Sequence, residues 1–522
     1  ELLATKLSNV VYSSGHFFLT LHSNYLSQLT QVGLPMMRPA LYWCDSAGGS
    51  LSCKGRTIPD ANAFWQFTAP FATDGIPIYA IIPMLAQTHL LEQLDALTAA
   101  EQQGFVRLRA AMDVTSLIGW LKEQPLFPRI YWHARERDRE FAVLGAIREL
   151  TDPAQLASLT GQLRPHAGSY PRYYGGLAFD YQQPVTDEWQ EFGQCRFVLP
   201  RIELIRQGNQ TELVCNLWFD GNNQASELAT ARKALQQLQP ETTLTHYLPA
   251  HSERINTPDK PRWLQWLSQV LEPEALKVIP KVVLSRRTTL QFSEELNPWD
   301  LLATWQSATP ACFHIGYQFS PESCFIASSP ERLYRRHDRQ LFSEALAGST
   351  PRTGDAEQDA ELASLLLQDG KNRLENRFVH TDILTRLDGL ADTAVVSEAQ
   401  ILPLKHIQHI KREIEATLLP ETADWQLLQK IHPTPAVGGS PRRKALSQIR
   451  ALELHQRGWY AGACGFISED VSEFTVAIRS GLWHQNQLHL YTGAGILTGS
   501  DAEAEWQELD TKLNSMLGVW HD

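Results

Sequence analysis

Residues 281–290 read Lys-Val-Val-Leu-Ser-Arg-Arg-Thr-Thr-Leu, a stretch rich in β-branched and apolar residues. This composition predicts a strand, in which successive side chains point to opposite faces. Lys281 then shares a face with Val283 and Ser285. Burial beside apolar neighbours favours an uncharged lysine amine, which can act as a general base. The alternative is a lysine at a strand edge that extends its amine into water.

Further strand-like runs lie on both sides of this stretch, and helical patterns lie between them. The expected strands are 129–132, 141–147, 175–179, 197–205, 212–218, 312–319, 324–328, 340–347, 463–467, 473–480 and 488–492. The expected helices are 221–239, 263–271, 298–306, 355–387, 407–418 and a C-terminal helix from Asp501. The polar, proline-bearing segment 249–261 is expected to be a connection. Strand runs with helices inserted between them predict an α+β fold of large, mainly antiparallel sheets with helices packed outside.

The chain divides into three segments by pattern. Residues 1–83 show short apolar bursts without a sustained period, and a helical pattern begins at Met84. We interpret residues 1–83 as an N-terminal extension upstream of a native start at Met84, or alternatively as a small extra subdomain. Residues 84–260 form a sheet-rich portion of the main domain, and residues 261–522 form its remaining portion.

Charge and cysteine usage limit the possible partners and location. The 46 Lys and Arg against 58 Asp and Glu give a formal net charge of −12, which argues against a general nucleic-acid binder. The seven cysteines are scattered without a Cys-x-x-Cys pair, as in proteins with reduced thiols. No run approaches 18 apolar residues, and residues 1–14 lack a signal-peptide pattern. These features predict a cytoplasmic protein without a membrane or nucleic-acid partner.

A candidate acid follows the expected strand 324–328. In Ser329-Pro330-Glu331, the proline fixes the backbone and keeps the preceding serine extended. A carboxyl group held there in partly apolar surroundings can stay protonated and donate a proton to a leaving oxygen. The alternative is an exposed turn glutamate paired with Arg332 or Arg335.

Two glutamates on separate helices are candidates for a metal site. Glu375 has apolar residues three and four positions later, an unusual setting for a solvated carboxylate. Glu508 flanks the apolar stripe of the C-terminal helix and precedes Lys512 by one turn. Two such carboxylates over one site would suit Mg²⁺, which prefers oxygen ligands. The alternative for Glu508 and Lys512 is a surface ion pair.

Three loops of small residues allow a backbone to approach a ligand closely, although such loops are more often plain turns. They contain Gly348 and Ser349, Ala436, and Gly493. The spacing after Gly493 does not match a dinucleotide fingerprint, so we reject NAD binding. Arg479 is expected to face away from the apolar side of its strand and to hold a carboxylate.

Ten ordered motifs carry a resemblance to a known family. They are KVVLSR at Lys281, ASSPERL at Ala327, EALAGS at Glu344, KNRLENR at Lys371, IQHIKRE at Ile407, HPTPAVGG at His432, WYAGACG at Trp459, EFTVAIRS at Glu473, YTGAGI at Tyr491 and EWQELDTK at Glu505. In these motifs the chain resembles the chorismate-utilising enzymes, and among them the isochorismate synthases of the menaquinone type. A weaker likeness extends back to about residue 100. The resemblance implies the fold of anthranilate and aminodeoxychorismate synthases, with residues 261–522 as the chorismate-binding catalytic portion.

The resemblance also implies a role for each candidate residue. Lys281 would activate a water that attacks C2 of chorismate, and Glu331 would protonate the departing C4 hydroxyl. Glu375 and Glu508 would hold Mg²⁺ at the ring carboxylate, with Lys512 supporting that end. The remaining implied substrate contacts are Gly348, Ser349, His432, Ala436, Arg479, Tyr491 and Gly493.

Related activities leave alternatives open. Relatives that add ammonia lack a lysine at the position of Lys281, so water is the expected nucleophile and no glutamine amidotransferase subunit is expected. Salicylate synthases usually carry threonine where Ala436 stands, which favours a reaction that stops at isochorismate. The alternatives are a salicylate synthase, a siderophore-pathway isochorismate synthase and a noncatalytic chorismate-binding relative. Pro280 departs from the family pattern, which often places an acidic residue before the lysine.

Overall fold

A computed structural model of the chain describes residues 10–13, 16–19, 40–45, 52–57, 65–66, 78–97, 103–157, 159, 170–245, 247–405 and 407–518, with side chains from residue 85 onward. The chain separates into two compact units, Glu1–His89 and Leu90–Asp522. Each unit is described below by itself. The expected status of residues 1–83 as an extension falls largely outside the described residues and stays a prediction.

The first unit contains short antiparallel pairings. Its strands are β1 (Val10–Ser13), β2 (His16–Leu19), β3 (Ala40–Asp45), β4 (Ser52–Thr57) and β5 (Trp65–Gln66). Strand β2 pairs with β1 and β5, and β3 pairs with β4. Helix α2 (Ile78–Ala96) spans the boundary between the units. It begins before Met84, so the helical pattern expected from Met84 is the later part of a longer helix.

The second unit carries the remaining helices. They are α3 (Leu117–Lys122), α4 (Pro153–Ala157), the 3₁₀ helix η4 (Asp187–Trp189), α5 (Gln224–Gln236), α6 (Lys260–Val270), α7 (Pro273–Val278), α8 (Pro298–Ala308), α9 (Ala356–Gln368), α10 (Gly370–Leu387), α11 (Asp424–Ile431), α12 (Arg442–Leu452) and α13 (Ala502–Leu517). The expected helix 355–387 is two helices. Asp369 ends α9 and also caps α10, since its side chain accepts a hydrogen bond from the Asn372 amide.

The strands of the second unit pair antiparallel throughout the described residues. They are β6 (Gly104–Ala111), β7 (Arg129–His133), β8 (Arg139–Leu150), β9 (Tyr173–Leu177), β10 (Cys195–Gln207), β11 (Gln210–Phe219), β12 (His251–Thr257), β13 (Lys281–Phe292), β14 (Phe313–Ser320), β15 (Ser323–Ser329), β16 (Arg332–His337), β17 (Gln340–Pro351), β18 (Ala391–Val396), β19 (Gln400–Pro403), β20 (Ile407–Leu418), β21 (Gly439–Ser440), β22 (Ala463–Ile467), β23 (Val471–Val476), β24 (Ser480–His484) and β25 (Gln487–Leu497). The predicted α+β fold of large antiparallel sheets is confirmed.

Pairing runs through strands that are distant in sequence. From β13 it passes through β25, β24, β15, β14, β7 and β8 to β10. The first part of β10 pairs with β9 and its later part with β11, and a register shift against β8 lies at Leu199/Pro200. Proline lacks the N–H that a regular ladder needs, which suits a position where the pairing changes. From β9 the path continues through β22, β23, β16 and β17 to β20.

Two expected elements are wrong. The segment 249–261 is not only a connection, because it contains β12, which pairs with β13. The expected helix 407–418 is strand β20, in which Ile410, Ile414, Ala416 and Leu418 are buried at even positions. The isoleucine spacing in this segment imitates a helical pattern, but the burial follows the two-residue period of a strand.

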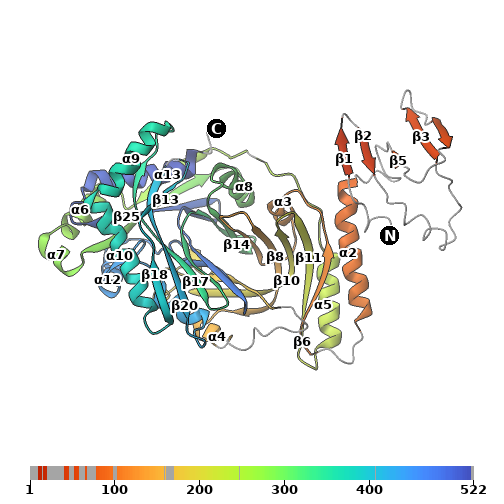
Figure 1. Cartoon of the computed structure of the whole chain (residues 1–522), viewed down its shortest axis with the longest axis horizontal. Helices are drawn as coiled ribbons and strands as arrows, with labels where there is room; N and C mark the ends of the chain where they lie inside the picture. Colours follow the sequence, from red (N-terminus) through yellow and green to blue (C-terminus); the bar gives the residue numbers. More distant parts are fainter. Residues whose placement is uncertain are drawn as a thin grey trace. The chain divides into compact units, whose positions relative to one another are not determined.

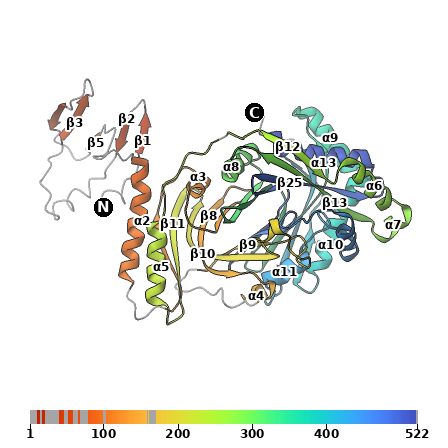
Figure 2. The same ribbon diagram turned by 180° about the vertical axis from the view of Figure 1, so that it is seen from behind.

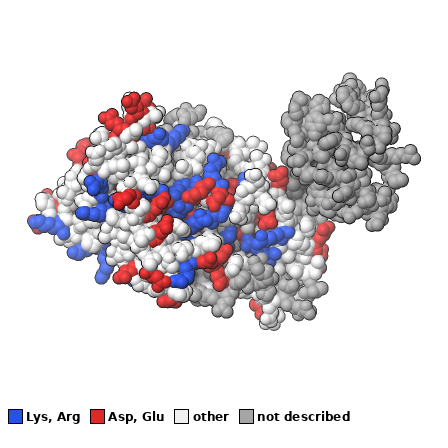
Figure 3. Space-filling model, in the orientation of Figure 1, with Lys and Arg blue, Asp and Glu red and all other residues white. Residues whose placement is uncertain are grey.

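Helices pack on the sheets near β13. Helix α10 contacts β17 and β20, and α13 contacts β25 and α6. Figures 1 and 2 show α9, α10 and α13 on the same side of this unit as β13 and β25. Basic and acidic side chains are intermixed over the face shown in Figure 3. Among the described helices, none combines the length and apolar character needed to cross a bilayer.

Candidate active site

Lys281, at the start of β13, is fully buried. Its Nζ lies 3.1 Å from Oε1 of Glu375, which α10 carries. Among the described residues, this amine makes no aligned hydrogen bond. The strand alternation is as predicted, since Val283 lies on the pocket side of β13 and Lys281 precedes it by two positions. The structure therefore favours the buried lysine over the solvent-reaching one.

Glu331 lies between β15 and β16 and is 3% exposed. Its backbone is held by Ser329 and Thr475: the Glu331 amide donates to Ser329 Oγ at 3.2 Å, and the Glu331 carbonyl accepts from Thr475 Oγ1 at 2.7 Å. Burial raises the pKa of the Glu331 carboxyl to about 8, with Glu344 adding to the rise and Lys281 and Lys512 opposing it. This carboxyl therefore stays protonated at neutral pH, as expected for a proton donor.

Helix α13 brings two carboxylates to the same pocket. Burial and the neighbouring Glu508 raise the pKa of Glu505, against the opposing effect of Lys371. Lys371 donates to Glu505 Oε1 at 2.7 Å, while Glu505 Oε2 is buried without a partner among the described residues. Burial alone would raise the pKa of Glu508, but Lys512, Lys371 and Lys281 together lower it.

These carboxylates fit a magnesium ion in part. No group of three or more His, Cys, Asp or Glu side chains in the described part of the chain is arranged to hold a metal by itself. Glu375, Glu505 and Glu508 nevertheless line one pocket, and Glu505 has a buried oxygen free of hydrogen bonds. Mg²⁺ often takes one or two carboxylates and completes its shell with water and substrate oxygens. The expected ligands Glu375 and Glu508 have the oxygen chemistry that this ion prefers, and their role as its ligands stays a prediction.

Arg479 reaches the pocket through a bend. It follows β23 rather than continuing it, and its φ of 49° lies in the left-handed region. The strand expected over 473–480 therefore ends at Val476. The Arg479 guanidinium lies 3.3 Å from Nε2 of His409 and has no acidic partner among the described residues. Burial and Arg479 keep the pKa of His409 well below its usual range, so this neutral ring leaves the positive charge of the guanidinium available to an anion.

Glycines let other groups approach the pocket. A Cβ at Gly495 would lie 2.6 Å from Glu375 Oε1, and one at Gly493 would lie 2.7 Å from the Tyr460 hydroxyl. Lys512 donates to the Gly493 carbonyl at 2.8 Å and pairs with Glu508 at 2.7 Å. Side chains at either glycine would therefore displace groups of the site.

The structure brings most of the predicted residues together. The pocket, of about 120 Å³, is lined by Glu331, Gly348, Ser349, Glu375, Ala436, Arg479, Tyr491, Gly493, Glu508 and Lys512. Lys281 lies directly beside it through Glu375. His432 does not line this pocket. It is buried beside residues 178–180, where burial and Arg442 lower the pKa of its ring to about 3.

Several lining residues were not predicted. They include Lys371, Asn372, His409, Tyr460, Gly495 and Glu505. Helical spacing contained a signal for some of them, because Lys371 and Glu375, and likewise Glu505, Glu508 and Lys512, recur every three or four residues on one helix face. His409 carried no such signal, since its segment was taken for a helix.

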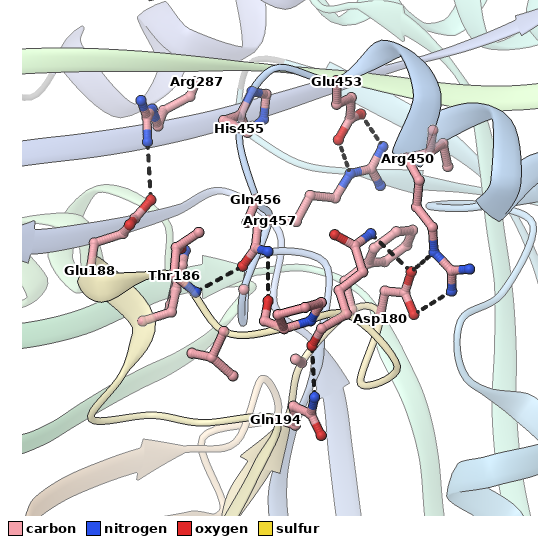
Figure 4. A pocket seen from close by; sticks show the side chains of 18 of the residues that line it. Asp180, Thr186, Glu188, Gln194, Arg287, Arg450, Glu453, His455, Gln456 and Arg457 are labelled. Carbon is pink, nitrogen blue, oxygen red and sulfur yellow. Dashed lines mark hydrogen bonds and ion pairs between the residues drawn. The ribbon is translucent and has the colours of Figure 1, made fainter.

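A larger cavity, of about 320 Å³, lies beside the other part of β13. Its charges pair with one another, as Figure 4 shows for Arg287 with Glu188, Arg457 with Glu453, and Arg450 with Asp180. Because these ion pairs engage every described Arg, Asp and Glu that lines this cavity, we take the smaller pocket as the candidate active site.

Comparison with known proteins identifies the family of the chain. Residues 90–520 match the family model described as "Chorismate binding enzyme". The chain belongs to this family of chorismate-binding enzymes. It is 36% identical to isochorismate synthase MenF of Escherichia coli over 406 residues, which are 77% of this chain and 89% of that protein. It is 31% identical to isochorismate synthase MenF of Haemophilus influenzae, over 84% of this chain and 98% of that protein.

Solved structures of related enzymes also resemble this chain. The menaquinone-specific isochorismate synthase MenF from Escherichia coli superposes with a TM-score of 0.76 at 33% identity, covering 84% of this chain and 99% of that one. Anthranilate synthase component I from Streptococcus pneumoniae shares the fold, with a TM-score of 0.60 at 19% identity, over 85% of this chain and all of that one. The predicted resemblance to isochorismate synthases among the chorismate-utilising enzymes is confirmed, as is the prediction of an enzyme.

Proposed function

We propose that the chain is a Mg²⁺-dependent isochorismate synthase of menaquinone biosynthesis that converts chorismate to isochorismate. The observation that carries this proposal is the burial of Lys281 and Glu331 at one pocket, which Glu331 lines and which Lys281 adjoins through its contact with Glu375. The MenF relatives and the matched family model support the same substrate. Chorismate as the substrate, a cytoplasmic location and the absence of an amidotransferase subunit belong to this proposal.

The net reaction removes the hydroxyl group at C4 of chorismate and adds one at C2. Lys281 would take a proton from a water whose oxygen bonds to C2 of chorismate. The ring double bonds shift, the C4–O bond breaks, and Glu331 gives its proton to the leaving hydroxyl, which departs as water. One water enters and one leaves, so substrate and product are isomers.

Other residues would hold the substrate in place. Arg479, which lacks an acidic partner among the described residues, would bind the enolpyruvyl carboxylate, with Tyr491 beside it. Glu375 and Glu508 would hold Mg²⁺, which when bound would offset the charge of the ring carboxylate. Gly348, Ser349 and Gly493 would allow close backbone contacts. The structure gives no support for a substrate contact by His432.

Product analysis tests the proposal. Purified protein is incubated with chorismate, with and without Mg²⁺, and the products are separated. Isochorismate alone, formed only with the metal, is the expected result. Salicylate with pyruvate would identify a salicylate synthase, against the indication from Ala436, and unchanged chorismate would identify a noncatalytic relative.

A further inference from the structure

A cavity of about 410 Å³ borders helix α10 away from the candidate active site. Arg373, Arg377 and His380 line it from α10, and Arg412 lines it from β20. The three α10 residues recur at four and three positions, so they share one helix face. Lys371, Asn372 and Glu375 of the same helix line the active-site pocket instead. We call this cavity the α10 arginine site.

The positive charges of the α10 arginine site are not neutralised within it. No Asp or Glu of the described residues lines the cavity. Arg373 and Arg377 make no ion pair or side-chain hydrogen bond with any other described residue. Arg412 donates to the Ser397 carbonyl at 2.7 Å, and its nearest carboxylate, that of Glu398, is 3.9 Å away on a fully exposed side chain. Nδ1 of His380 is buried without a partner in the described part of the chain.

We propose that the α10 arginine site binds a small phosphate-bearing anion. Guanidinium groups form paired hydrogen bonds with phosphate oxygens, and three arginines line this cavity, with the side chains of Arg373 and Arg377 open to solvent. A phosphate monoester carries a charge of about −1.5 to −2 at pH 7, which matches this set better than the single charge of a carboxylate. A partly open cavity of about 410 Å³ lies in the size range of small-molecule sites.

The α10 arginine site lies next to the candidate active-site pocket. Asn376 lines the α10 arginine site, and its amide donates to the carbonyls of Ala345 at 3.0 Å, Ala347 at 3.3 Å and Ile410 at 3.1 Å. Ala347 also lines the active-site pocket, and Ile410 lines the arginine site. Phosphate could therefore also enter the nearby active site, at Arg479, and the experiment must separate the two locations.

Calorimetric titration with inorganic phosphate and with glycerol 3-phosphate, at constant ionic strength, tests the proposal. Four proteins are compared: the unchanged chain, the Arg373→Gln/Arg377→Gln double variant, Arg479→Gln as the active-site control, and Arg109→Gln as a matched control at an exposed arginine of β6. The expected result is saturable binding at one site that weakens about tenfold or more in the double variant, and in neither control. Circular dichroism checks folding, and Arg377→Gln alone replaces the double variant if that protein is unfolded.

Three outcomes would overturn the proposal. Equal affinity in the double variant and the unchanged chain would show that the arginines do not hold the anion. Loss of binding in Arg479→Gln alone would place the phosphate in the active site. Competition by chloride at similar concentrations would indicate an adventitious ion only.

Discussion

The buried amine of Lys281 and the carboxylate of Glu375 lie 3.1 Å apart, although one comes from a strand and the other from a helix. The proposed base and the proposed metal ligand are therefore linked electrostatically. A substitution of either residue therefore changes the electrostatic environment of the other.

Lys281→Ala should reduce kcat/KM for chorismate by about 10²–10⁴-fold, because the variant has no group to take the proton from the attacking water. Steady-state kinetics with chorismate and Mg²⁺ measures the loss. Lys277→Ala is the matched control, since Lys277 is an exposed lysine of α7 that pairs only with Glu274 among the described residues. Similar activity in both variants would contradict the role of Lys281.

Activity should fall as the pH rises through about 8, because Glu331 must carry its proton to donate it and its pKa is about 8. The pH profile of kcat/KM measures this alkaline limb. Glu331→Gln should lower activity by about 10²–10⁴-fold. A profile that stays flat to pH 9 would contradict the assignment of Glu331 as the acid.

The same pKa predicts a change in stability. A carboxyl whose pKa rises from 4.5 to about 8 on folding makes the fold progressively less stable between these pH values, because the unfolded chain releases the proton earlier. Glu331→Gln removes this effect. Thermal unfolding should therefore show the variant gaining stability relative to the unchanged chain as the pH increases from 4.5 to 8. A constant difference over this range would show that the carboxyl is not held protonated.

Gly495→Ala should raise the Mg²⁺ concentration needed for half-maximal activity by about tenfold or more, because the new Cβ would lie 2.6 Å from Glu375 Oε1 and displace that carboxylate. Activity measured against Mg²⁺ concentration tests this expectation. Gly518→Ala is the control, since a Cβ at that position would meet no other described part of the chain within 4 Å, its own helix and chain neighbours aside. An unchanged magnesium requirement in Gly495→Ala would argue against Glu375 as a ligand.

Ile414→Ala should destabilise the protein by about 2–5 kcal/mol, because Ile414 is fully buried in β20. The adjacent Glu415 is exposed, and Glu415→Ala should change the free energy of unfolding by about 0.5 kcal/mol or less. Denaturant unfolding of both variants measures the difference. Equal effects would contradict the alternating burial of this strand.

Local pattern predicted the strands well where alternation was clear, as in 281–290. It failed at 407–418, because Ile407, Ile410 and Ile414 also fit a helical period and only long-range pairing with β17 decides between the two. The residue types at Lys281 and Glu331 suggested a base and an acid, but each residue could equally have been an exposed surface side chain. Only burial, which depends on the whole fold, separates the two.

The sequence motifs predicted most of the site residues, but not all of them. Motifs identified ten lining residues, whereas His432 lies elsewhere, since a motif does not state which way a loop side chain points. Glu505 was missed although it lies one turn before Glu508. Its helix face was visible in the sequence, but its partner Lys371 comes from another helix.

The interleaved pairing has a consequence for how the chain can be divided. Strand β14 needs β7 as its neighbour, and β22 needs β9, so a cut near residue 260 leaves both fragments with open sheet edges. Neither half is expected to fold alone. Co-expression of the two pieces would be needed to regenerate the enzyme by fragment complementation.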